Sequence, residues 1–198
     1  MATERQKTAH HAYDDEKGEF RLSVVLVFPR RENEKWDGGD TILDQLGELS
    51  DYAKDTVRVF MASTWSGARR VNIANALTSL GQKGARVEVI TMSDIDQGVI
   101  TQLNLLSGAG GYVKIMDVTK EVDHSKVMLI KVIWDGTMQR IVLMGSENYG
   151  EGALKYNNNF LPRLKNSALF SATGIIMVKS ELPCRPGRPN KMPLAMWL

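Results

Sequence analysis

The stretch that decides the fold is residues 57–91, VRVFMASTWSGARRVNIANALTSLGQKGARVEVIT. It divides into a strand, a helix and a second strand, which we predict at 57–62, 68–82 and 85–91. Gly84 lies between the helix and the second strand, and glycine readily adopts the positive φ that ends many helices. A strand, a helix and a strand in this order predict a right-handed crossover between two parallel strands.

The segments on either side extend this pattern into an α/β domain. Upstream, residues 20–28 predict a strand, and Asp40 and Thr41 predict the cap of a helix with apolar residues Ile42, Leu43, Leu46 and Leu49. Downstream, we predict a helix at 94–106, a turn at 108–111, and strands at 112–116, 125–134, 139–145 and 172–178. Asp135-Gly136 favours a hairpin between two of these strands. The expected fold class is α/β, an α-β-α sandwich with a mixed and largely parallel sheet and helices on both faces.

Length and composition predict one folded domain with a polar segment at each end. The chain has 198 residues, of which 43% are hydrophobic, which is enough to bury one core. Residues 1–19 are polar and lack periodicity, so we predict a disordered tail. Four prolines and several basic residues predict an extended basic tail over 179–198. The folded domain is then expected over residues 20–178.

Cysteine content and charge indicate the cellular compartment of the protein more than its function. Cys184 is the single cysteine, so the chain has no disulfide framework of its own and no cysteine-based zinc site. No apolar leader is visible and no apolar run approaches the roughly 20 residues of a membrane span, so we predict a cytoplasmic protein. The net charge of +2, from 25 Lys and Arg against 23 Asp and Glu, permits nucleic-acid binding without indicating it.

Polar residues suited to phosphodiester chemistry gather in two segments, His124-Ser125-Lys126 and Gly145-Ser146-Glu147-Asn148. In each segment two side chains are two positions apart, so in a strand they would project from the same face. An imidazole can attack phosphorus, while an ammonium and neutral donors stabilise charge on the phosphoryl oxygens. We therefore predict a catalytic set that requires no metal ion, made of His124, Lys126, Ser146 and Asn148.

These two segments resemble the signature of the phospholipase D superfamily, in which His-x-Lys is followed by Asp and then by Gly-Ser-x-Asn. The resemblance extends over about residues 20–163, and residues 148–157 are similar to the family's Asn-x-x-x-x-Ala-Leu-x-x-Asn segment. It implies a phospholipase D-like sandwich and a metal-independent phosphodiesterase that needs no cofactor and forms a phosphohistidine. It also implies supporting roles for Asn157 and Asn159.

Two positions depart from the family pattern. Lys131 stands where the family has Asp after His-x-Lys, and Asn159 stands where an acidic residue follows the second Asn. In the family such a carboxylate orients and charges a catalytic histidine, whereas an amide keeps a hydrogen bond without the charge. Asp123 and Glu147 are the alternative carboxylates, although a strand would point Glu147 away from the motif side chains.

The histidine content predicts the assembly. His10 and His11 fall in the expected tail, so the folded part holds one histidine, His124. A reaction that needs both a nucleophile and an acid then needs a second copy, and a two-fold homodimer supplies it. The two imidazoles would take opposite protonation states through coupled titration. The resemblance to short one-motif members favours a non-specific nuclease that acts on nucleic acid.

Three other interpretations stay open. The first is a phospholipase D-type lipid hydrolase or transferase that acts on phospholipid headgroups. The second is a degenerate phosphate-binding module, and the third is one half of a two-motif enzyme. The substitutions at Lys131 and Asn159 favour the degenerate module. Outside the motif, the candidate substrate contacts are Arg69, Arg70 and Trp65, against the simpler interpretation that the arginines are surface charges and Trp65 packs in the core.

Overall fold

A computed structural model of the chain describes residues 22–23, 40–61, 65, 67–120, 124–134, 136–146, 148–150 and 163–181. The described helices are α1 (Thr41–Gly47), α2 (Ala68–Gln82), α3 (Gln97–Gly108) and α5 (Ser167–Glu181). The described strands are β1 (Leu22–Ser23), β2 (Thr56–Met61), β3 (Arg86–Met92), β4 (Tyr112–Met116), β5 (Lys126–Trp134), β6 (Thr137–Met144) and β7 (Arg163–Lys165).

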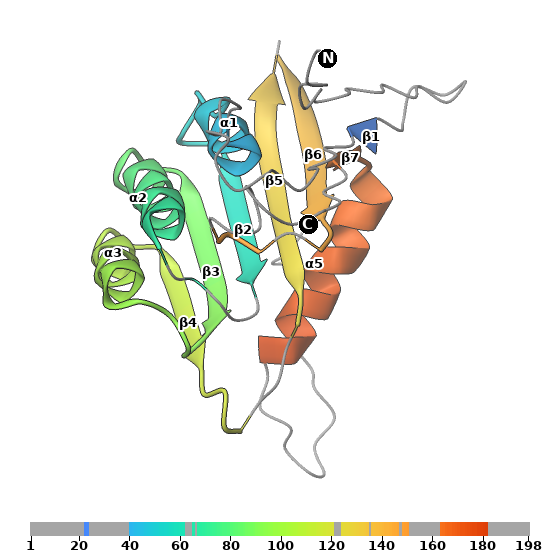
Figure 1. The fold of residues 1–198 in the computed structure, drawn as a ribbon. Coiled ribbons are helices and arrows are strands. Elements are labelled where there is room, and N and C mark those ends of the chain that lie inside the picture. Colours follow the sequence, from blue (N-terminus) through green and yellow to red (C-terminus); the bar gives the residue numbers. More distant parts are fainter. Residues whose placement is uncertain are drawn as a thin grey trace, which may run out of the picture.

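The strands form one mixed sheet in the order β1-β7-β6-β5-β2-β3-β4 (Figure 1). β2, β3 and β4 pair in parallel, as the predicted crossovers require. The other four neighbouring pairs are antiparallel. The predicted α/β fold with a mixed sheet is therefore confirmed, but its parallel part is smaller than expected. The short connection between β5 and β6 makes that pair antiparallel, as the predicted hairpin requires, and β5 also pairs antiparallel with β2.

Helices cover both faces of the sheet, also as predicted (Figure 1). α1, α2 and α3 pack on one face, against alternate strand residues such as Val59, Val89 and Met128. α5 covers the other face, where Leu169 and Phe170 pack against the residues between these, which are Phe60, Ile90, Leu129 and Val142. Both faces thus carry buried apolar residues, and each strand residue is assigned to a face by its position in the alternation.

The predicted last strand at 172–178 is wrong, because residues 167–181 form α5. Asn166 precedes this helix, and its side-chain oxygen accepts a hydrogen bond of 2.8 Å from the backbone N–H of Leu169. A short apolar run does not distinguish a strand from a buried helix, whereas a capping Asn marks a helix start. α5 continues past the predicted domain end at 178, and β7 has no counterpart among the predicted strands.

The helices and strands between α1 and β6 agree closely with the predicted ones. Asp40 caps α1 by accepting hydrogen bonds from the N–H groups of Ile42 and Leu43. Gly84 has φ +101° after α2, and Gly136 has φ +74° in the hairpin between β5 and β6. That hairpin explains the wide spacing of the two motif segments.

The ends of the chain are mostly outside the described part. The predicted tail at 1–19 lies there entirely, and the tail at 179–198 lies there beyond the end of α5. Of the strand predicted at 20–28, residues 22–23 are described, as β1. No helix in the described part of the chain is long and apolar enough to cross a membrane.

Candidate active site

His124 and Lys126 lie at the start of the central strand β5. β5 begins at Lys126, so His124 precedes the strand instead of belonging to it. The Nζ atom of Lys126 is 3.2 Å from Nε2 and 3.3 Å from Nδ1 of His124, and it also donates to the His124 carbonyl oxygen at 3.2 Å. The lysine is buried and the imidazole is exposed. An anionic group bound to the imidazole would therefore lie beside an ammonium.

The second motif segment begins next to the first. The backbone N–H of Gly145 donates to the carbonyl oxygen of Lys126 at 3.3 Å, directly after the last pair of the ladder, Val127 with Met144. Ser146 and Asn148 follow beyond the end of β6. The structure thus brings the backbones of both predicted segments to the same end of the hairpin.

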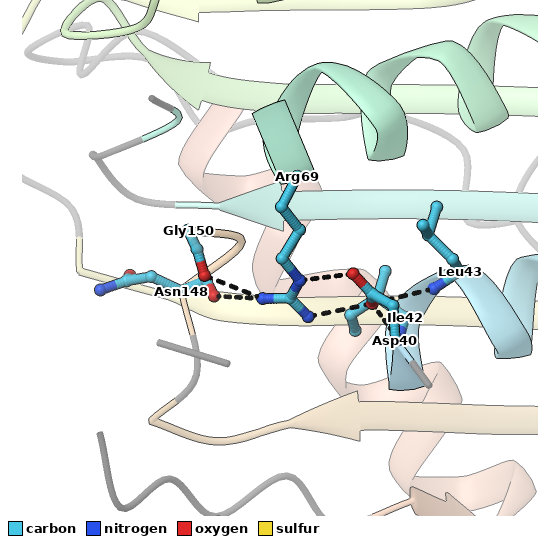
Figure 2. A network of polar contacts seen from close by, with 6 residues as sticks. All are labelled: Asp40, Ile42, Leu43, Arg69, Asn148 and Gly150. Carbon is cyan, nitrogen blue, oxygen red and sulfur yellow. Dashed lines mark hydrogen bonds and ion pairs between the residues drawn. The ribbon is translucent and has the colours of Figure 1, made fainter. Parts of the chain in front are cut away.

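Arg69, at the start of α2, reaches the segment that follows Ser146 (Figure 2). Its Nη1 atom donates to the carbonyl oxygens of Asn148, at 3.2 Å, and Gly150, at 3.1 Å. Its Nε and Nη2 atoms donate to the two carboxylate oxygens of Asp40, at 2.5 and 3.0 Å. The Arg69 side chain is 5% exposed. The side chain is thus buried and these donors bind protein acceptors, and its predicted contact with substrate stays a prediction.

Trp65 and Arg70 contact the same segment. The Trp65 ring is fully buried and packs edge-on against Tyr149, with the ring centroids 4.9 Å apart. The ring thus packs in the core, and its predicted contact with substrate stays a prediction. The Arg70 guanidinium packs against the α-carbon of Gly150, where a side chain would collide with it. Burial lowers the pKa of Arg70, an effect that Asp96 opposes and Arg69 reinforces.

Lys131, at the position of the family's Asp, does not face the motif. Leu129, two positions before it, packs under α5, whereas Met128, two positions after Lys126, packs under the other helices. By alternation along β5, Lys126 and Lys131 project from opposite faces of the sheet. A charge at position 131 therefore acts on the α5 face.

The remaining predicted site residues lie outside the described part of the chain, and these are Asn157, Asn159, Asp123 and Glu147. In the described part, no group of three or more His, Cys, Asp and Glu side chains is arranged to hold a metal ion. The sequence predicts Asp40 as a helix cap but gives no sign of its ion pair with Arg69. The two residues are 29 positions apart, and no local pattern connects them.

Comparison with known proteins identifies the family. The family described as "Cardiolipin synthase, PLD-like domain" matches residues 47–173, more than half of the chain. The chain therefore belongs to the phospholipase D superfamily, a family of phosphodiesterase-type enzymes, as the motif residues predict. No curated protein matches the sequence.

Solved structures agree on the fold. Nuc from Salmonella typhimurium, described as a phospholipase D family member, gives a TM-score of 0.54 at 16% identity, over 81% of this chain and 93% of its own. NucT from Helicobacter pylori gives 0.55 at 17% identity, over 81% and 95%. Polyphosphate kinase from Porphyromonas gingivalis gives 0.56 at 16% identity, over 85% of this chain and 27% of its own. At these identities the likeness concerns the fold alone.

Proposed function

We propose that this chain is a metal-independent phosphodiesterase that acts through a phosphohistidine on His124, and that it is a non-specific nuclease active as a homodimer. The observation that carries the proposal is the contact of the Lys126 ammonium with the His124 imidazole, 3.2 to 3.3 Å from its ring nitrogens, beside the Gly145 end of β6. Membership of a phosphodiesterase family supports the same chemistry.

The proposed reaction has two steps. A ring nitrogen of His124 attacks phosphorus, and the bond from phosphorus to the leaving oxygen breaks as that oxygen takes a proton from a second imidazole. Water then attacks the phosphohistidine, gives its proton to the second imidazole and restores both histidines. Lys126, Ser146 and Asn148 stabilise the charge on the phosphoryl oxygens in both steps.

The second imidazole is proposed to be His124 of a partner subunit. His124 is the one histidine in the described part of the chain, because His10 and His11 lie outside it. A two-fold axis passing near the site would bring each His124 opposite its copy, and the phosphodiester would bind between them. The mechanism requires one imidazole to be neutral as the nucleophile and the other to be protonated as the acid.

Nucleic acid is the proposed substrate because its backbone presents repeated phosphodiesters that a basic site can bind without reading bases. Arg70 is a proposed contact to this backbone, since it lies at the start of α2 and its guanidinium is beside Gly150, next to the second motif segment. The phospholipid headgroup stays the alternative substrate. Cleavage of plasmid DNA against cleavage of phospholipid vesicles separates the two.

The test is the cleavage of bis(p-nitrophenyl) phosphate and of plasmid DNA in excess chelator by the parent, His124→Ala, Lys126→Met and Lys131→Met. We expect the parent to turn over, His124→Ala to be inactive, and Lys126→Met to lose about 100-fold or more in kcat. Lys131→Met is the matched control, because it removes a lysine from the same strand but from the opposite face, and it should keep the parent's rate. A folded parent without turnover would instead support a phosphate-binding module without catalysis.

A further inference from the structure

The segment 148–150 is held at three consecutive residues. The carbonyl oxygens of Asn148 and Gly150 accept hydrogen bonds from Arg69, and the Tyr149 ring packs against Trp65. The guanidinium of Arg70 packs on Gly150 from α2. We call these contacts the 148–150 clamp. Because they act on backbone atoms and on a buried ring, they set the path of the chain directly after Ser146.

Asp40 fixes the central member of the clamp. Its carboxylate receives two donors of the Arg69 guanidinium, at 2.5 and 3.0 Å, while its Oδ1 atom also caps α1 through the N–H groups of Ile42 and Leu43 (Figure 2). Figure 2 shows the guanidinium between this carboxylate on one side and the two backbone carbonyls on the other. A guanidinium is planar and has donors in fixed directions, so holding one edge at Asp40 determines where the other donors point.

We infer that Arg69, held by Asp40, is a positioning residue that places Asn148 for its contact with the phosphoryl group. The inference rests on the proposed function for the role of the Asn148 side chain. Arg69 contacts the backbone carbonyl of Asn148 and not its side-chain amide. It therefore fixes the position of the backbone that carries this amide. A displacement of about 1 Å in such a group can lower a rate by about 100-fold.

The kinetic test compares Arg69→Met with Arg58→Met. Arg58 is the matched control because it forms a half-buried ion pair with Glu88, at 2.8 Å, on the face covered by α5. We expect Arg69→Met to lower kcat by roughly 10- to 100-fold while KM changes little. The reason is that the clamp orients Asn148 for the reaction and does not itself bind the substrate. Arg58→Met should lose stability and keep kcat. Asp40→Asn should fall between Arg69→Met and the parent, because Asn still caps α1 but gives up the charge of the ion pair.

A double-mutant cycle separates positioning from general loss of structure. If Arg69 acts through Asn148, then Arg69→Met should lower kcat no further in an Asn148→Ala protein, because the amide to be positioned is already gone. If Arg69→Met lowered kcat by the same factor in the parent and in Asn148→Ala, the inference would be overturned. A second result would also overturn it. If Arg69→Lys leaves amide hydrogen exchange at residues 148–150 unchanged but is as slow as Arg69→Met, then Arg69 does not act by positioning this segment.

Amide hydrogen exchange provides a measurement that does not depend on turnover. We expect exchange at residues 148–150 to be at least about tenfold faster in Arg69→Met than in the parent and in Arg58→Met. Unchanged exchange would overturn the inference whatever the kinetics show. A parent without turnover would refute the proposed function alone, and the same cycle would then be measured on the affinity for inorganic phosphate. Phosphate binding that Arg69→Met leaves unchanged would overturn the inference in that case as well.

Discussion

Lys131 and Arg140 lie directly opposite each other on β5 and β6, on the face of the sheet that α5 covers. Like charges in directly opposed positions of an antiparallel pair repel each other. The family's Asp at position 131 would turn this pair into an ion pair. The substitution therefore bears on the stability of the sheet, whereas Lys126 projects from the other face.

We predict that Lys131→Asp stabilises the fold without changing catalysis. An Asp opposite Arg140 should raise the free energy of unfolding by about 0.2–1 kcal/mol, the usual range for a cross-strand charge pair. Urea unfolding measures this change, and the phosphodiesterase assay measures kcat. Lys131→Gln is the control, because it removes the repulsion without adding an attraction and should gain less. A rise in kcat of tenfold or more in Lys131→Asp would contradict the placement of residue 131 away from the site.

The family signature could be recognised in the sequence because each signal is local. His124 and Lys126 are two positions apart, and Gly145 to Asn148 form one tetrapeptide. The interaction between Asp40 and Arg69 could not be predicted, since it depends on how α1 and α2 pack beside each other on the same face of the sheet. Local patterns therefore identify a motif more readily than contacts between residues far apart in the sequence.

Among the elements, α5 differs most from its prediction. Residues 172–178 form an apolar run rich in β-branched side chains, which is typical of strands, yet they belong to a helix that Asn166 caps. Gly174 lies on the buried side of α5, with Arg58 and Leu129 at 3.6 and 3.8 Å from the position of an added methyl group. Both are ordinary contact distances, so this glycine is not required by close packing.

We predict that Gly174→Ala stabilises the protein. Alanine in a helix interior is favoured over glycine by about 0.5–1 kcal/mol, and the methyl group meets no obstacle. Gly81→Ala in α2 is the comparison, because there the methyl group would come within 2.7 Å of a Leu106 methyl carbon. That side chain must move, so the helix gain should be partly or wholly lost. Thermal unfolding of both variants checks the difference, and a destabilised Gly174→Ala would argue against α5 as a helix in this place.

For the molecule as a whole, Asp55 links stability to pH. It lies just before β2 and is 1% exposed. Burial raises the pKa of Asp55 above its ordinary value of 3.8, although hydrogen bonds from the backbone, including that of Ile133, act the other way. The folded protein thus holds this proton more tightly than the unfolded chain. Its contribution to stability is full at low pH and is lost as pH rises through the raised value.

We predict that Asp55→Asn is more stable than the parent at neutral pH, because the buried carboxylate is replaced by a neutral group of the same shape. The difference in free energy of unfolding should shrink as pH falls toward 3.8 and vanish below it. Urea unfolding at several pH values measures it. Asp117→Asn is the control at an exposed carboxyl whose pKa is lowered by hydrogen bonds from Thr119, so its trend with pH should have the opposite sign. A constant difference for Asp55→Asn would contradict this account.

The proposed homodimer makes a prediction about mixtures. If each reaction uses His124 from both subunits, a mixed dimer with one His124→Ala subunit lacks either the nucleophile or the acid. With a ninefold excess of the variant and free exchange of subunits, activity per parent chain should fall roughly tenfold. Arg58→Met in the same excess should cause no such loss. Activity that does not depend on the excess of His124→Ala would instead indicate a site complete in one chain.

The hairpin of β5 and β6 is anchored to the site at one end and turns at Gly136 at the other. Residue pairs added next to the turn lengthen the ladder while Lys126 and Gly145 keep their hydrogen bond, and pairwise addition keeps every side chain on its own face. The hairpin can therefore be lengthened at the turn without changing the geometry at the Lys126 and Gly145 end. The turn is therefore a suitable place to insert a reporter or an affinity peptide, because eight residue pairs of the ladder separate it from Lys126 and the candidate site.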